Sequence, residues 1–171
     1  QTPNAFRHGE HARDYDRRGR HMTWKPAVAA LTLRKQVDKR WPKRDRGADG
    51  IIGDKAHQAR GSVSDHNPNS RGFVDAIDID ADLLGKGKGR TAAKKLADQI
   101  VAYAASGKPG SKRIKYVVFN DQIASGTYAN SMWKWRGSGY GHYDHIHVSF
   151  TPLGENDARL FPLPIFDTPK K

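Results

Sequence analysis

Two segments in which apolar and polar residues alternate constrain the fold of this chain more than any other feature. Residues 72–80 (GFVDAIDID) and 145–151 (HIHVSFT) both predict strands, because side chains in a strand point alternately to opposite faces. In the first segment Ala76, Asp78 and Asp80 share one face, and two isoleucines take the other. The segments therefore predict a sheet with one polar and one apolar face.

Further strands are predicted at 114–119 (IKYVVF) and 122–124, joined by a hairpin turn at Asn120-Asp121. Residues 43–72 are rich in Gly, Asp, Asn and Arg and predict mostly loop. A second long loop is expected at 126–141, which is rich in tryptophan and tyrosine.

Two stretches with helical periodicity complete the expected elements. The first has Thr23 as its N-cap and Pro26 in its first turn, and it ends before Pro42. The second is capped by Thr91 and stops at Gly107. The expected buried positions are Ala30, Leu33, Val37 and Trp41 in the first helix, and Ala93, Leu96, Ile100, Tyr103 and Ala104 in the second.

Strands and helices do not alternate regularly, so we expect an α+β fold with a small antiparallel sheet flanked by helices. The length of 171 residues favours a single domain. We assign residues 23–171 to it and treat 1–22 as an N-terminal arm. The tail has four prolines after position 150 and is expected to wrap the surface.

The chain lacks cysteine and carries a formal net charge of +12. Any metal must therefore be held by His, Asp or Glu. The charge predicts attraction to polyanions, and nucleic acids and anionic cell-wall polymers fit it equally well. No stretch approaches the ~18 consecutive apolar residues of a membrane-spanning helix. No apolar region follows the basic N-terminus, so no signal peptide is expected.

Histidines and carboxylates gather in two places, SDHNP with VDAIDID, and HYDHIH. His145 and His147 share one face of their predicted strand. Catalytic zinc typically takes three protein ligands and leaves a fourth position for water. A loop histidine (His66), a carboxylate from one strand and a histidine from another would supply that set.

Such a site also needs a group that moves protons. Asp144 lies three residues before His147 and is the expected general base. His145 is expected to stabilise the developing oxyanion. The carboxylate ligand would come from Asp75, Asp78 or Asp80 of the first segment. All three could also be solvated carboxylates or a calcium-type oxygen cluster.

The segments SDHNPNSRGFVDAIDID and HYDHIHVSF resemble the paired motifs of the lysostaphin/D-Ala-D-Ala peptidase/hedgehog superfamily. Within it, they are most similar to D-Ala-D-Ala carboxypeptidase-type enzymes of phage endolysins. The resemblance covers about residues 24–151. It implies zinc bound by His66, Asp78 and His147, with Asp144 as general base and His145 as transition-state stabiliser.

The resemblance also indicates where substrate would bind, and three features depart from the pattern. The loop between the first two ligands is longer, Val74 replaces a glycine, and the usual upstream substrate-binding arginine is not recognisable, with Arg60 or Arg71 as replacements. The tryptophans of the 126–141 loop either pack on the core or wall a substrate groove. The expected substrate-binding residues are Ser64, Arg71, His142 and Trp135.

The sequence thus predicts a monomeric zinc peptidase that acts on peptidoglycan in the bacterial cell wall, as a phage lysin or an exported enzyme. Two rivals remain open. The charge and the DHNPN segment also suit a metal-dependent nuclease of the His-Asn-His type, although its later histidine would need to lie on a helix. A non-catalytic, zinc-containing wall-binding module is the other rival.

Overall fold

A five-stranded antiparallel sheet forms the centre of the structure, a computed structural model that describes residues 24–51, 64–126 and 132–167. The order of its strands is β3-β7-β4-β5-β6. Two short strands, β1 and β2, form a separate parallel pair. The strands are β1 (Lys25–Pro26), β2 (Phe73–Val74), β3 (Ala76–Asp80), β4 (Ile114–Phe119), β5 (Gln122–Ser125), β6 (Arg136–Gly137) and β7 (His145–Phe150).

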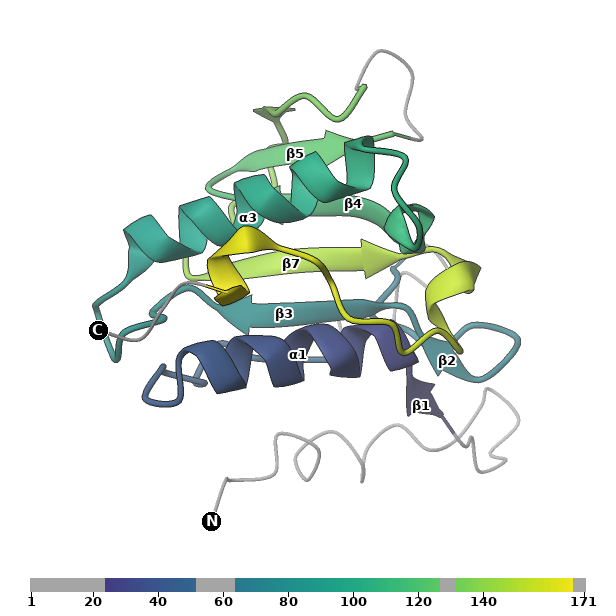
Figure 1. Cartoon of the computed structure of the whole chain (residues 1–171), viewed down its shortest axis with the longest axis horizontal. Coiled ribbons are helices and arrows are strands. Elements are labelled where there is room, and N and C mark those ends of the chain that lie inside the picture. Colours follow the sequence, from purple (N-terminus) through teal and green to yellow (C-terminus); the bar gives the residue numbers. More distant parts are fainter. Residues whose placement is uncertain (1–23, 52–63, 127–131, 168–171) are drawn as a thin grey trace.

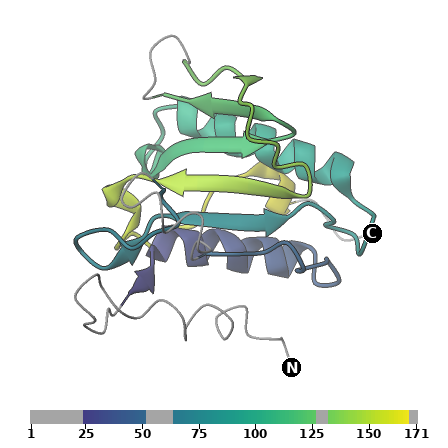
Figure 2. The same cartoon turned by 180° about the vertical axis from the view of Figure 1, so that it is seen from behind.

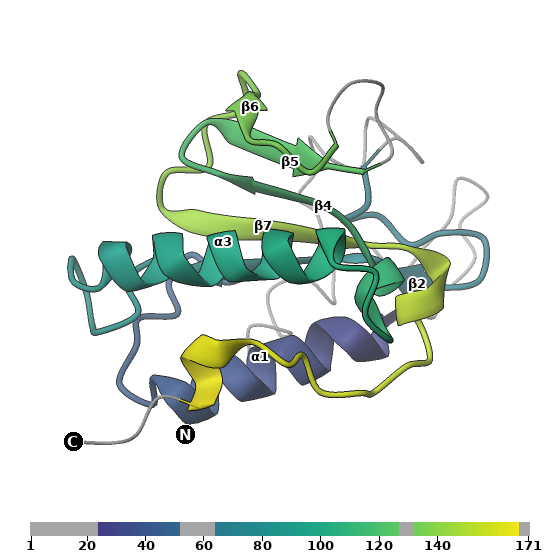
Figure 3. The ribbon, with the colours of Figure 1, turned by 45° about the horizontal axis from the view of Figure 1, so that its top comes forward.

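Two helices, α1 (Val28–Arg40) and α3 (Arg90–Ala105), cover the same face of this sheet (Figure 1). Figure 3 shows them side by side, with the C-terminal segment against α1. From behind, the opposite face of the sheet is seen without a helix over it in the described part of the chain (Figure 2). The prediction of an α+β fold with an antiparallel sheet is therefore confirmed, with both helices on one side.

The alternation of the strands decides which side chains face the helices. Ile77 and Ile79 of β3 and Ile146 and Val148 of β7 are fully buried in the core. The helices contribute the apolar positions that their periodicity predicted, and all of those are buried. Burying a Val, Leu or Ile side chain stabilises the fold by about 1.5–3 kcal/mol, so this layer fixes the sheet on the helices.

The same alternation places the polar side chains of β3 and β7 on the face that the helices leave open. β7 lies between β3 and β4, and His147 is paired with Asp78 on one side and with Val118 on the other. Directly paired residues on one face of an antiparallel sheet have Cβ atoms about 4.5–5.5 Å apart. The sheet register therefore brings a histidine and a carboxylate from distant segments together.

The predicted start of α1 is wrong. The helix begins at Val28, and Pro26 lies before it in β1 instead of in the first helical turn. The expected cap, Thr23, lies outside the described residues. The backbone N–H of Val28 donates to the carbonyl of Glu155 at 3.0 Å, so a tertiary contact provides what a local cap was expected to provide.

The predicted cap of α3 is also wrong. Gly89 is the N-cap, with φ of 99°, and Thr91 lies inside the first turn. Only glycine reaches this φ without steric cost, which explains why the chain enters the helix here. The ends of both helices are as predicted, at Arg40 before the proline and at Ala105 before Gly107.

The strands differ from prediction in two places. The segment expected as one strand over 72–80 is interrupted at Asp75, whose carbonyl accepts the N–H of Phe150. The loop expected at 126–141 contains β6, which adds an edge strand beside β5. The hairpin is confirmed: Asn120 and Asp121 have φ of 50° and 58°, the left-handed values that a two-residue turn of this type needs.

The C-terminal segment contributes to the core instead of only wrapping the surface. Phe161 and Leu163 are each 1% exposed. The backbone of Phe161 exchanges two hydrogen bonds with the Gln36 side chain of α1, and the N–H of Ile165 donates to Gln99 of α3. The segment thus ties the two helices together. In the part of the chain that the structure covers, neither helix has the length and apolar character needed to cross a membrane.

Candidate metal centre

Three ligand-type atoms converge on the open face of the sheet. Nε2 of His66 lies 3.0 Å from Nδ1 of His147 and 3.2 Å from Oδ1 of Asp78. Nδ1 of His147 lies 3.1 Å from the same oxygen. The three side chains are almost entirely or mostly buried, with exposures of 6%, 20% and 6% for His66, Asp78 and His147. The three atoms thus form a nearly equilateral triangle.

The outer nitrogen of each imidazole is held by a partner. Nδ1 of His66 lies 2.6 Å from the carbonyl of Ile51, which can only accept, so this nitrogen carries the proton. In the neutral ring, Nε2 is then left with its lone pair toward the triangle. Nε2 of His147 lies 2.7 Å from the hydroxyl of Ser149. When that nitrogen donates, Nδ1 has a free lone pair as well. Histidine ligands of metals are oriented by partners of this kind.

Electrostatics keep the triangle's carboxyl group ionised. Burial lowers the pKa of His147 to about 4, so this ring is neutral at pH 7. Burial opposes the charge of Asp78 too, but the neighbouring rings of His66 and His147 outweigh it and hold the pKa of this carboxyl below its usual range. Burial also lowers the pKa of His66, yet the Asp78 carboxylate raises it overall. The carboxylate and the two imidazole nitrogens form a set of donor atoms that could hold a metal ion.

The turn that carries His66 is fixed to the sheet. The hydroxyl of Ser64 accepts the backbone N–H of His66 at 3.3 Å, and its carbonyl accepts that of Asn67 at 3.0 Å. Next to it, Nζ of Lys115 in β4 binds the carboxylate of Asp65 at 3.0 Å. Ser64, expected to bind substrate, thus shapes the turn that carries His66.

The expected catalytic pair lies at the solvent edge of the triangle. Asp144 is 65% exposed, and its Oδ1 accepts from Nδ1 of His145 at 2.6 Å. Nε2 of His145 lies 3.8 Å from Oδ1 of Asp78. The His142 ring is in edge contact with the rings of His145 and His147, at centroid distances of 4.6 and 5.6 Å. The structure therefore brings together all the histidines that the sequence predicted for the site.

Asp75, a rival for the carboxylate ligand, lies in a different environment. Nδ2 of Asn69 donates to Asp75 at 3.0 Å and to Glu155 at 2.8 Å. Burial and the neighbouring Glu155 raise the pKa of Asp75 to about 7. Arg71 binds the same Glu155 at 2.7 Å, so this expected substrate-binding residue is engaged in a structural ion pair.

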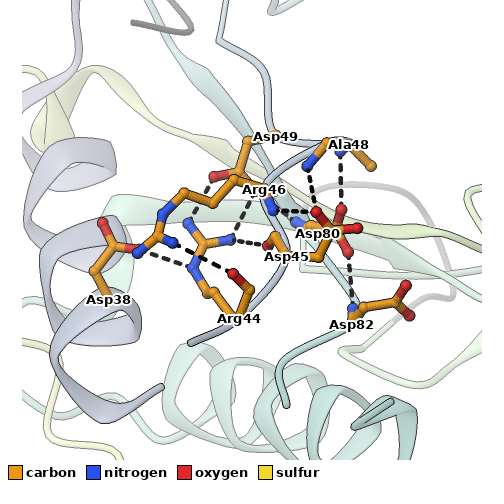
Figure 4. A network of polar contacts seen from close by, with 9 residues as sticks. Asp38, Arg44, Asp45, Arg46, Ala48, Asp49, Asp80 and Asp82 are labelled. Atoms are coloured by element: carbon orange, nitrogen blue, oxygen red, sulfur yellow. Dashed lines mark hydrogen bonds and ion pairs between the residues drawn. The ribbon is translucent and has the colours of Figure 1, made fainter. Parts of the chain in front are cut away.

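Asp80, the other rival, belongs to a second group of carboxylates that could hold a metal by distance alone, with Asp45 and Asp82. Its oxygens accept the backbone N–H groups of Ala48, at 2.9 Å, and of Asp82, at 2.8 Å (Figure 4). Asp45 accepts from Arg46 and Asp82 from Gly87 in the same way. This group already has donors for its carboxylates.

Trp135 is not brought to the histidines. Its indole N–H donates to Asp98 of α3 at 2.9 Å, and Nζ of Lys94 lies 4.6 Å from its ring centroid. Because α3 covers the opposite face of the sheet from His147, Trp135 packs on the core rather than walling the site.

Three residues of the site were missed from the sequence. Ser149 follows His147 by two positions in β7, so strand periodicity could have found it. Tyr116, whose ring stacks on His147 at 5.3 Å, sits after a register shift in β4 that breaks the alternation. The carbonyl of Ile51 carries no sequence signal, because any residue provides one.

Comparisons of the chain with protein families, with curated proteins and with solved structures found no match.

Proposed function

We propose that this chain is a zinc-dependent peptidase that hydrolyses a peptide bond in bacterial peptidoglycan. The observation that carries the proposal is the triangle formed by His66, Asp78 and His147, with atoms 3.0–3.2 Å apart. Tetrahedral zinc ligands at about 2.0–2.1 Å from the metal lie roughly 3.3–3.4 Å from one another. The three atoms would move apart by only a few tenths of an ångström, roughly, to accept zinc.

The donor set suits a catalytic rather than a structural zinc site. Two imidazoles and one carboxylate give three protein ligands, as in hydrolytic zinc enzymes, where the fourth position is left open. Asp78 keeps 20% of its side chain exposed and His145 keeps 21%, so the site has access to solvent. Bound there, zinc would lower the pKa of water to about 7 and polarise the scissile carbonyl.

The chain's own acid–base groups stand beside this position. One oxygen of Asp144 is bonded to His145, and this exposed carboxylate has a second oxygen with which to accept a proton from the attacking water. In its protonated form, His145 keeps Nδ1 on Asp144 and donates from Nε2 to the developing oxyanion. His142 borders the same space.

The substrate class rests on the resemblance of the two motif segments to D-Ala-D-Ala carboxypeptidase-type enzymes and on charge. We propose the hedgehog/DD-peptidase type of fold, with the sheet carrying the zinc site. The net charge of +12 would favour adhesion to anionic wall polymers. The proposed place of action is accordingly the cell wall.

The test combines zinc analysis with release of soluble fragments from purified peptidoglycan, for the wild type and for His147→Ala and Asp144→Asn. Wild type should bind about one zinc per chain and release fragments. His147→Ala should lose both properties, and Asp144→Asn should keep zinc but lose cleavage. The matched control is Asp98→Asn on the far face of the sheet, which should change neither.

A metal-dependent nuclease is the second candidate, because a net charge of +12 would also attract nucleic acid. A supercoiled plasmid with Mg²⁺ provides the discriminating assay. Nicking by wild type but not by His147→Ala, with intact peptidoglycan, would replace the peptidase proposal. The position of both histidines in strand β7 argues against the His-Asn-His type, which needs the later histidine on a helix. Zinc binding without either cleavage would point to the wall-binding module.

A further inference from the structure

A buried arginine organises the segment that precedes the first ligand loop. The Arg44 side chain is 0% exposed. Its Nη1 and Nη2 donate to both oxygens of Asp49 at 2.8 and 2.6 Å, and its Nε donates to Asp38 of α1 at 2.7 Å (Figure 4). A bidentate pair of this kind fixes the orientation of the carboxylate as well as its distance.

Asp49 also links the segment to strand β3 by a hydrogen bond. Its Oδ1 accepts the backbone N–H of Asp80 at 2.7 Å. The next residue, Gly50, exchanges two backbone hydrogen bonds with Asp78, at 2.8 and 3.2 Å. The segment therefore lies against β3 beside the carboxylate of the triangle, held at one end by Arg44.

Ile51 follows immediately, and its carbonyl is the partner of Nδ1 of His66 at 2.6 Å. The position of this carbonyl decides which nitrogen of the ring carries the proton and thus which one faces the triangle. A shift of the 49–51 segment would remove that constraint without touching any ligand.

We propose that Arg44 and Asp49 are positioning residues for the metal centre: they hold Gly50 and Ile51 against β3 so that the Ile51 carbonyl keeps Nε2 of His66 as the ligand atom. The proposal rests on the proposed function in one respect, that the ion bound is zinc. Buried ion pairs often stabilise a fold no better than apolar residues would. We therefore assign the Arg44–Asp49 pair a role in orienting the His66 ring, besides any contribution to stability.

The experiment compares Asp49→Asn with Asp38→Asn, because both remove a carboxylate partner of the same buried arginine. Asp49 also accepts the backbone N–H of Asp80 in β3, whereas Asp38 lies on α1 and binds the side chains of Arg44 and Arg46. Arg44→Lys is the second variant, since lysine keeps the charge but cannot form the bidentate pair. Three quantities are measured: the Kd for zinc by chelator competition, the thermal midpoint without metal, and the ¹⁵N shifts of the His66 ring in metal-free protein.

Asp49→Asn and Arg44→Lys should each weaken zinc binding by about 10-fold or more, the effect typical of partners that orient metal ligands. The ¹⁵N shifts of His66 should move away from the form with the proton on Nδ1. Asp38→Asn should lower the thermal midpoint but keep the Kd within about threefold of wild type. If Asp49→Asn cannot be folded, Arg44→Lys decides.

Two results would overturn the proposal: wild-type zinc affinity in the Asp49 or Arg44 variants, or an equal loss in Asp38→Asn, which would mean that affinity follows stability alone. The ring shifts are read without metal. They therefore decide the positioning role even if wild type binds no zinc, which would refute only the proposed function.

Discussion

Asp78 and Asp80 lie two residues apart on one face of β3, and each belongs to a group of three side chains whose ligand atoms lie within 4.8 Å of one another. Their surroundings are opposite. Asp78 faces two imidazole nitrogens whose other ring positions are occupied, whereas Asp80 accepts backbone N–H groups from Ala48 and Asp82. Proximity of carboxylates alone therefore does not define a candidate metal site; the partners of each carboxylate matter too, imidazole nitrogens for Asp78 and backbone N–H groups for Asp80.

The largest expected effect is on metal content. Asp78→Asn replaces the one charged ligand with a neutral amide, and bound zinc should fall from about one per chain to a small fraction of that. Atomic emission after gel filtration measures it. A variant that retains full zinc would mean that the two histidines bind the metal with another group.

The matched change at the other carboxylate is Asp80→Asn, which should keep the zinc. The substitution should instead lower the stability of the fold, because an amide has only one oxygen to accept the two backbone N–H groups that bind the carboxylate. The free energy of unfolding should drop by about 1–3 kcal/mol in chemical denaturation with chelator present. Loss of zinc in a folded Asp80→Asn protein would break the comparison.

A smaller effect is expected from Ser149→Ala, which removes the partner of Nε2 of His147. Without the hydroxyl, the ring is less well oriented, and zinc affinity should fall by about 10-fold, or ~1.4 kcal/mol. Chelator competition measures the Kd. Ser106→Ala, at the end of α3, is the control and should leave the Kd unchanged.

The third carboxylate of this segment, Asp75, should affect only the pH dependence of stability. Its pKa is raised from 3.8 to about 7, mainly by burial, so the folded state binds more protons than the unfolded state between these values. The free energy of unfolding should therefore fall as pH rises from about 4 to about 7. Glu155, whose pKa is lowered chiefly by Arg71, acts below this window.

Denaturation midpoints between pH 4 and pH 8, roughly the window of that titration, measure this slope. Asp75→Asn does not titrate and should flatten it, while Ser106→Ala, at the end of α3, should leave it unchanged. An unaltered slope in Asp75→Asn would assign the pH dependence to another group.

Much of the fold could be predicted because it depends on local pattern. Apolar residues at helical spacing gave the buried faces of α1 and α3, and alternation gave β3, β4 and β7. The start of α1 could not be predicted, because the N–H of Val28 is satisfied by Glu155, which is distant in the sequence. Periodicity also could not predict that Tyr116 lies beside His147, because the register of β4 shifts between Ile114 and Tyr116.

By itself, the sequence determined the α+β architecture and the residue types that could form a metal site, since periodicity and side-chain chemistry are local properties. Which of Asp75, Asp78 and Asp80 lies beside the histidines was decided only by the tertiary structure. Pairing of β3 with β7 brings Asp78 to His147. The segment held by Arg44 supplies one backbone donor to Asp80 and the carbonyl that orients His66. Whether a carboxylate is free to bind a metal depends on neighbours that come from elsewhere in the chain.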